Sequence, residues 1–258
     1  MTNVNGRMID LSVPISHNAA HEPWKPTFEY YTHEDKGLKW IEDQFGVDAS
    51  VLEHSHHKGA AFEIITSINH SGTHVDAPWH YAPTAEGKPA KTIDQCPIEW
   101  FFGDGVVLDL RHKKPGELIT VQDLQSALKK INYNLKPFDI VLLMNCRDEH
   151  LGSEKYYEQP GMTKESTLWL VDQGIKVIGV DMYGFDLSFK DMAENYRKTG
   201  DSSTIWQAHF AGIEREYCQI EKLANLDKIP RPHGFKVSCL PVKIEGGSAG
   251  WCRAVAFV

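Results

Sequence analysis

Residues 138–145 read FDIVLLMN and residues 175–181 read IKVIGVD, two short and mostly apolar runs. Runs of this length are typical of strands that are buried on both faces of a sheet. Between them lies KESTLWLVDQG (164–174), whose apolar residues recur at helical spacing and whose final glycine is a common helix stop. This strand–helix–strand order predicts an α/β protein in which neighbouring strands run parallel.

The same pattern begins earlier in the chain. GVVLDL (105–110) reads as a strand, and VQDLQSALKKI (121–131) reads as a helix. Thr120 followed by Asp123 resembles a capping box, which predicts that the helix begins at this point. The middle of the chain therefore alternates strands and helices.

Strands are also expected outside this region. They fall in four segments rich in β-branched and aromatic residues: MIDLSVPI (8–15), AFEIITSIN (61–69), FKVSCLPVKIEGG (235–247) and SAGWCRAVAFV (248–258). The last two are expected to be joined by the glycine-rich turn between them. Residues 17–58 are polar, aromatic and weakly periodic, so we expect a long excursion over a functional site. The histidine-rich segment 54–57 is a candidate to cover that site, and the alternative is that it is simply exposed.

The composition excludes several classes of protein. Of 258 residues, 41% are hydrophobic and no Pro/Gly/Ser-rich linker interrupts them, which favours a single domain spanning residues 1–258. The net charge is −8 and basic residues do not cluster, so nucleic acids and membranes are not expected partners. No stretch approaches the ~18 apolar residues of a membrane span. The N-terminus lacks a signal peptide's apolar run, and the five cysteines are scattered and odd in number, which favours reduced thiols in the cytoplasm.

The chain has 13 histidines, three of them within NHSGTHVDAPWHY (69–81). Side chains alternate sides along an extended chain, so His70, His74 and Asp76 are expected to share one face. Two imidazoles and one carboxylate on one face form a ligand set for Zn, Mn or Fe. Such a set leaves coordination positions open for water, as a catalytic metal site requires.

The rest of this motif has two expected roles. Gly72 and Pro78 disfavour a helix and are expected to shape the backbone so that the ligands converge. A fourth protein ligand would tend to close the metal site, so His80 is assigned to proton transfer just outside it. The alternative for His80 is a further metal ligand or a structural histidine.

These residues resemble a known family. His70–His80 matches H-x-G-T-H-x-D-x-P-x-H at every specified position, and so resembles the metal-dependent cyclase family, which contains bacterial kynurenine formamidases and isatin hydrolases. VIGVDMYGFD (177–186) is similar to the family's G-V-D-x-x-S-x-D, with Gly184 in place of the usual Ser. IEKLANLDKIP (220–230) resembles its I-E-N-L-x-N-L segment, with Lys222 in place of Asn.

The resemblance implies a function and an architecture. It implies that His209 and Glu221 complete the metal site, and that Gln207 in the sequence QAH is a candidate ligand of the isatin-hydrolase type. The implied fold is a swivelling β/β/α domain, with a mixed sheet and packed helices, in a homodimer or homotetramer. The implied reaction is hydrolysis of an amide bond with one or two Zn²⁺ or Mn²⁺ ions. The bond would belong to an N-formyl aryl amide, as in kynurenine formamidases, or to a cyclic amide such as isatin.

An aromatic amide substrate would need flat surfaces to stack on. Five aromatic residues near the motifs are candidates for this role: Trp79, Trp206, Phe210, Tyr183 and Phe185. The alternative for each of them is an ordinary place in the core.

Other interpretations compete with amide hydrolysis. His74, Asp76 and His209 also fit the H-x-D…H triad of non-haem Fe(II) oxygenases, but the two helical stretches disfavour the all-β core usual in that class. A lactone or ester substrate, and metal binding without turnover, are further alternatives. Ser248 lies in GGSAG, a formal match to G-x-S-x-G, but no acid or histidine follows it, so a serine hydrolase is rejected.

Overall fold

The computed structural model describes residues 6–258, which divide into two compact units. One unit holds residues 6–15 and 69–258, and the other holds residues 16–68. This division concerns compactness alone, so the expectation of one domain over residues 1–258 stays a prediction.

The larger unit is built on a mixed nine-stranded sheet, counted over the described residues. In spatial order its strands are β1 (Met8–Asp10), β15 (Val255–Phe257), β13 (His233–Ser238), β7 (Phe102–Asp109), β9 (Ile140–Met144), β11 (Val177–Val180), β12 (Cys218–Glu221), β4 (His74–Asp76) and β14 (Ala249–Trp251). The four central strands β7, β9, β11 and β12 are parallel, and the outer pairs are antiparallel. The predicted α/β fold with a mixed sheet is confirmed.

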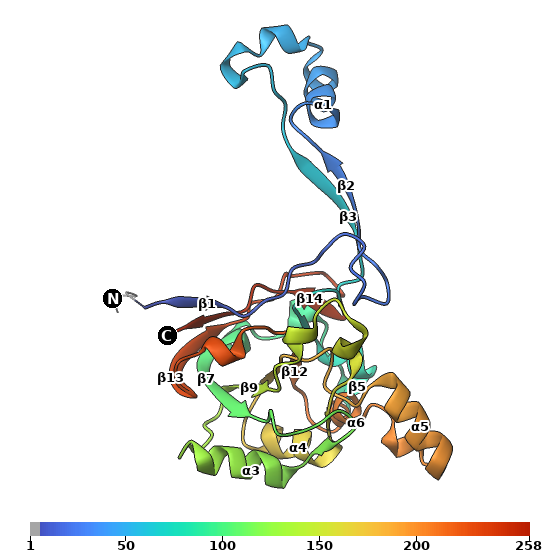
Figure 1. Ribbon diagram of the computed structural model, residues 1–258, viewed down its shortest axis with the longest axis vertical. Coiled ribbons are helices and arrows are strands. Elements are labelled where there is room, and N and C mark those ends of the chain that lie inside the picture. Colours follow the sequence, from blue (N-terminus) through green and yellow to red (C-terminus); the bar gives the residue numbers. More distant parts are fainter. Residues whose placement is uncertain (1–5) are drawn as a thin grey trace. The chain divides into compact units, whose positions relative to one another are not determined.

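Helices connect the parallel strands. Between consecutive strands lie α3 (Val121–Lys130), α4 (Lys164–Asp172), and then α5 (Phe189–Thr199) with α6 (Gln207–Ala211). Figure 1 shows α3 and α4 next to each other along the sheet. The predicted capping box is confirmed: the Thr120 hydroxyl accepts a hydrogen bond from the Asp123 amide, and the Asp123 carboxylate accepts one from the Thr120 amide.

Successive side chains of β9 point to opposite faces of the sheet, and this explains where the core lies. Val141 and Leu143 are fully buried in the apolar cluster that includes residues of α3 and α4. Ile140 and Leu142 are buried in a second cluster, with residues of β1, β13 and β12. A strand covered on both faces has to be apolar at every position, which is why residues 140–144 read as a continuous run.

The two C-terminal segments pair with each other as expected, and the second of them also supplies a strand elsewhere in the sheet. SAGWCRAVAFV divides into β14, which pairs with β4, and β15, which pairs with β13. The expected pairing is present: β13 runs antiparallel to β15 from Lys236–Phe257 to Ser238–Val255. In the same register Pro241 bridges Cys252, and the Val242 amide donates a hydrogen bond to the Trp251 carbonyl.

Residues 16–68 contain the expected strand, together with a second strand and a helix outside the expected segments. β2 (Thr27–Tyr31) pairs with β3 (Phe62–Thr66) as an antiparallel hairpin, and α1 (Lys36–Phe45) lies between them in sequence. The Asp35 carboxylate caps α1 by accepting from the Lys36 amide. The strand expected in residues 61–69 is confirmed as β3, and His54, His56 and His57 are exposed in this unit.

Smaller elements complete the fold. β5 (Thr84–Ala85) pairs with β6 (Lys88–Pro89), and β8 (Leu118–Ile119) pairs with β10 (Gly161–Met162). In the part of the chain that the structure describes, no helix has the length and apolarity needed to cross a membrane.

Candidate metal centre

Strand pairing brings the two halves of the candidate centre together. β4 lies between β12 and β14, and Glu221 of β12 pairs directly with His74 of β4. Asp76 is two residues further along β4, so its side chain lies on the same face of the sheet as the side chains of His74 and Glu221. His74 and Asp76 have no exposed surface, and Glu221 is buried as well.

His70 reaches this face through a turn. The expectation that His70, His74 and Asp76 share one extended segment is wrong for His70, because the extended strand begins only at His74. Gly72 makes the turn at a φ of +63°, and a Cβ there would lie 2.8 Å from the Ile15 side chain. The turn places His70 Nδ1 2.8 Å from Asp76 Oδ1.

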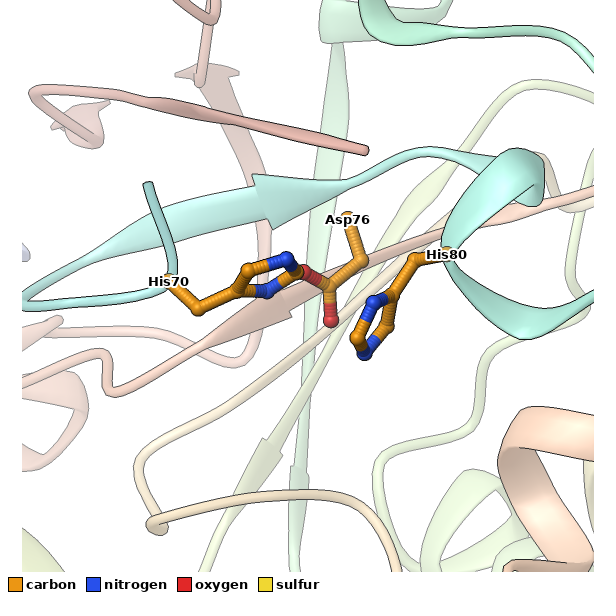
Figure 2. A group of neighbouring side chains, drawn as sticks. All are labelled: His70, Asp76 and His80. Atoms are coloured by element: carbon orange, nitrogen blue, oxygen red, sulfur yellow. The ribbon is translucent and has the colours of Figure 1, made fainter. Parts of the chain in front are cut away.

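His80 lies in a short helix, contrary to the expectation that Pro78 disfavours one. α2 (Pro78–Tyr81) begins at Pro78, where proline is tolerated because the first residue of a helix needs no amide hydrogen. This single turn directs the His80 ring toward the other imidazoles, 4.1 Å from His70 and 5.4 Å from His209, measured between ring centroids. Figure 2 shows His70, Asp76 and His80 pointing toward one another.

Three imidazoles share one arrangement: one ring nitrogen is held by an outer group and the other faces the centre. His74 Nδ1 lies 2.8 Å from the Gly72 carbonyl oxygen, and His209 Nδ1 lies 2.5 Å from Asp186 Oδ2. His70 Nε2 lies 3.0 Å from the Ser248 hydroxyl. Carbonyl and carboxylate oxygens only accept, so Nδ1 of His74 and of His209 carries a hydrogen, and Nε2 is the nitrogen that could bind a metal in place of a proton.

The inner atoms converge on two carboxylates. His74 Nε2 lies 3.2 Å from Asp76 Oδ1 and 3.6 Å from Glu221 Oε2, and His209 Nε2 lies 3.7 Å from Glu221 Oε1. Despite these short distances, His74 Nε2 and both oxygens of Asp76 have no partner with hydrogen-bond geometry. Buried polar atoms without partners are costly, and a coordinated cation would satisfy all three.

The donor atoms fit a divalent metal. Those of His70, Asp76 and His80 lie within 4.8 Å of one another, as do those of His74, Asp76 and Glu221. Asp76 belongs to both groups, so its two oxygens can serve one ion or bridge two. Imidazole nitrogens with carboxylate oxygens are the ligands that Zn²⁺ and Mn²⁺ accept.

The carboxylates and imidazoles shift one another's pKa. Burial would raise the pKa of Asp76, but positive charge on His74, His80 and His70 holds it well below its usual range. The pKa of Glu221 is raised, first by burial and then by the negative charge of Asp76. Two ionised carboxylates in one buried site repel each other, and a bound cation would offset this repulsion.

The two remaining histidines shift in opposite directions. Burial, reinforced by His70, His209 and His74, lowers the pKa of His80 to about 4, although Asp76 opposes the shift. Burial would also lower the pKa of His209, but Asp186, Glu221 and Asp76 outweigh it and raise the pKa to about 9. His80 is therefore neutral near pH 7 and has a lone pair that can take a proton.

The candidate aromatic residues occupy different places. The Trp206 ring stacks on His209 with centroids 4.7 Å apart and lies 5.9 Å from His80. Trp79 and Phe210 are exposed, whereas Phe185 is fully buried in the core with α3 and α4 residues. The Tyr183 ring lies 4.8 Å from the ammonium of Lys222.

Gln207 and several residues outside the predicted set also need placing. Gln207 is the first residue of α6 and is half-buried, and a separation of two on a helix turns its side chain away from that of His209. Asp186 and Ser248 hold imidazoles of the centre, and the buried Lys222 ammonium donates to the His70 carbonyl at 2.9 Å. The sequence marks Ser248 only as a candidate nucleophile. Asp186 ends the VIGVDMYGFD segment, but that pattern gives it no partner, because His209 follows after a long intervening segment.

Comparison with known proteins connects this geometry to named relatives. The family model described as putative cyclase matches residues 9–187. The kynurenine formamidase of Erythrobacter litoralis (strain HTCC2594) is 30% identical over 191 residues, which are 74% of this chain and 74% of that protein. The solved structure of an isatin hydrolase bound to the product analogue thioisatinate superposes with a TM-score of 0.76 at 19% identity, covering 98% of this chain and 92% of that one. A potential metal-dependent hydrolase with cyclase activity superposes with a TM-score of 0.64 at 19% identity, covering 97% of each chain.

Proposed function

Since this chain belongs to the putative cyclase family, we propose that it is a metal-dependent hydrolase that cleaves an amide bond outside peptides. The observation that carries the proposal is the convergence of the inner imidazole nitrogens on Asp76 and Glu221, with the neutral His80 beside them. A kynurenine formamidase among the relatives and an isatin hydrolase among the similar structures support the choice of an amide bond.

The residues that would hold the metal are His70, His74, Asp76, His209 and Glu221, with Gln207 as a weaker candidate. When bound, a divalent ion supplies an acidified water and a Lewis acid that polarises the amide carbonyl. Zn²⁺ and Mn²⁺ both suit the nitrogen and oxygen donors, and the two groups that share Asp76 provide for one ion or two.

His80 would move the proton. Its ring lies against His70 and His209 at the edge of the centre, and its low pKa keeps it unprotonated near pH 7. A neutral imidazole in this place accepts a proton from the attacking water and returns it to the leaving nitrogen of the amide. Proton transfer of this kind converts a poor amide leaving group into a neutral amine.

The substrate class that fits best is an aryl amide. Trp206 beside His80 and the partly exposed rings of Trp79 and Phe210 offer faces for a flat substrate. Within this class we favour a cyclic amide such as isatin or an N-formyl aryl amide, and the second is the reaction of a kynurenine-type arylformamidase. A lactone or ester is the next alternative.

The test combines metal content with turnover. The purified protein is analysed for bound metal and assayed on isatin and on N-formylkynurenine with Zn²⁺ or Mn²⁺ added. We expect metal and hydrolysis of at least one substrate in the wild type, and loss of both in Asp76→Ala. His112→Ala, which removes an exposed histidine, is the matched control and is expected to keep both. A metal-free Asp76→Ala protein with full activity would refute the proposal.

The location and assembly are also proposals. The scattered, odd cysteines support a cytoplasmic location, and we infer a homodimer or homotetramer.

The unit of residues 16–68 supports assembly, because it exposes large apolar side chains: Tyr30, Trp40, Phe45, Ile64 and Ile65. Light scattering on the wild type and on an Ile64→Lys, Ile65→Lys double variant tests this. A wild type that is a monomer at all concentrations would contradict it.

A further inference from the structure

We propose that Asp186 is a positioning residue that sets the tautomer of His209 and so makes its Nε2 available to the metal. The inference rests on the proposed function, because it assigns a metal-binding role to His209. It concerns a residue outside the metal-binding motif and outside the set of candidate ligands.

Both oxygens of Asp186 are committed to the start of α6. Oδ2 lies 2.5 Å from His209 Nδ1, and Oδ1 accepts from the Ala208 amide at 2.8 Å. The side chain is only 5% exposed, so water does not compete for these contacts. A carboxylate has no hydrogen to donate, so the hydrogen between the two groups resides on His209 Nδ1. His209 Nε2, which faces Glu221 at 3.7 Å, is then the nitrogen that would bind a metal in place of a proton.

Packing fixes the plane of the same ring. Trp206 stacks on one face of His209 at an angle of 18°, and Tyr81 meets it edge-on with centroids 5.5 Å apart. Trp206 adopts a left-handed backbone conformation with a φ of +50°, which is unusual for an aromatic residue. Strained backbone of this kind persists where surrounding contacts hold it in place, commonly at functional sites. Packing thus orients the imidazole, and Asp186 decides which nitrogen is protonated.

Asp186 is itself held by a buried carboxamide. Gln159 Nε2 donates to the Gly184 carbonyl at 2.9 Å and to the Asp186 carbonyl at 2.6 Å, and Gln159 Oε1 accepts from the Gly184 amide at 3.2 Å. A Cβ at Gly184 would lie 3.1 Å from Glu221 Oε1. Residues 184–186 are therefore held by hydrogen bonds to Gln159 and also lie against the candidate metal ligand Glu221.

The geometry makes the effect of an isosteric change specific. In Asp186→Asn, the amide oxygen is expected to keep the shorter of the two backbone hydrogen bonds, from the Ala208 amide at 2.8 Å rather than from the His209 amide at 3.4 Å, so the NH₂ group faces His209 Nδ1. That nitrogen must then accept, which moves the ring hydrogen to Nε2 and removes the lone pair the metal needs. In Asp186→Ala, the side chain at position 186 no longer selects a tautomer, so the hydrogen of the neutral His209 ring can reside on either nitrogen. Asp186→Asn should therefore weaken metal binding more than Asp186→Ala does. Loss of side-chain volume alone predicts the opposite order.

The experiment is calorimetric titration of the metal-free protein with Zn²⁺ and with Mn²⁺. We expect the Kd to rise roughly 10- to 100-fold in Asp186→Asn, the usual range for a lost outer partner of a ligand, and less in Asp186→Ala. Asp139→Asn is the matched control, because Asp139 is also buried but accepts hydrogen bonds from the Tyr133 hydroxyl and the Lys136 amide instead. It should bind both metals within about twofold of wild type.

A second measurement does not depend on the variants folding. In ¹⁵N NMR spectra of the Zn²⁺-loaded wild type, His209, assigned by the signal lost in His209→Gln, should carry its hydrogen on Nδ1. A hydrogen on Nε2, or equal metal affinity in wild type and Asp186→Asn, would overturn the inference. Neither readout needs a substrate. Failure of the proposed function would give a different result: the metal affinities of wild type and variants would follow the expected order, but the protein would hydrolyse no amide.

Discussion

Glu221 and His74 face each other across the antiparallel pair formed by β12 and β4, with Oε2 of one 3.6 Å from Nε2 of the other. The two residues belong to strands that are distant in sequence and are paired directly in the sheet. A cation held between them would therefore connect the β4 segment to the parallel centre of the fold. Metal binding is for this reason expected to stabilise the folded protein.

The first prediction concerns that stabilisation. Metal at about 100 times its Kd should add about 2.7 kcal/mol to the free energy of unfolding, which corresponds to a rise in Tm of roughly 5–10 °C. The measurement is thermal unfolding in chelator and in Zn²⁺ or Mn²⁺. Glu221→Gln, which keeps the shape and removes the charge, should lose most of the rise, whereas His112→Ala should keep it. An equal rise in Glu221→Gln would show that the stabilising ion binds elsewhere.

The second prediction separates proton transfer from metal binding at His80. His80→Ala should retain the metal and lose about 10²- to 10⁴-fold in kcat, the usual contribution of a general acid or base. Metal analysis and steady-state kinetics are made on the same preparation. If the metal disappears together with the activity, His80 is a ligand, which was its alternative assignment.

The third prediction concerns Ser248. Its hydroxyl lies 3.0 Å from His70 Nε2, where it orients an imidazole but touches no carboxylate of the centre. Ser248→Ala should weaken metal binding by about tenfold or less, since only one outer partner is removed. With saturating metal, turnover should return to near the wild-type value. Complete loss of turnover under those conditions would revive the serine-hydrolase interpretation.

The fourth prediction is a pH effect at Asp181. Burial is the main cause of its pKa being raised to about 7, and hydrogen bonds from the Asn145 and Cys146 amides oppose it only in part. The folded state therefore holds this proton more tightly than the unfolded chain. The contribution of this proton to the free energy of unfolding is complete below about pH 4 and is lost as the pH rises through about 7. The contribution is about 1.4 kcal/mol for each unit by which folding raises the pKa.

Chemical unfolding of the metal-free protein between about pH 4 and pH 8 measures this effect. The loss of unfolding free energy across that range should be smaller in Asp181→Asn, because the amide does not ionise. Asp191→Asn, at the start of α5, is the control and should follow the wild-type pH dependence. Parallel profiles for wild type and Asp181→Asn would contradict the raised pKa.

Local patterns in the sequence were sufficient for the central elements. β9 and β11 were predicted from apolar runs, and α3 from its apolar spacing together with the Thr120 capping box. Each of these signals acts within a few residues, through side-chain burial or through hydrogen bonds to neighbouring amides. The same locality explains an error: Pro78 as a sequence signal disfavours a helix, but proline is tolerated in a first turn, and α2 begins at Pro78.

The sequence by itself determined the chemistry of the candidate centre, because imidazole and carboxylate groups at fixed spacing identify a metal-ligand set. Only the tertiary structure decided how these groups meet. It placed Glu221 opposite His74, turned His70 inward at Gly72, and set Asp186 behind His209. The physical reason is that strand register and the outer hydrogen bonds of a histidine depend on packing between segments far apart in the chain, and a local sequence pattern carries no information about that distance.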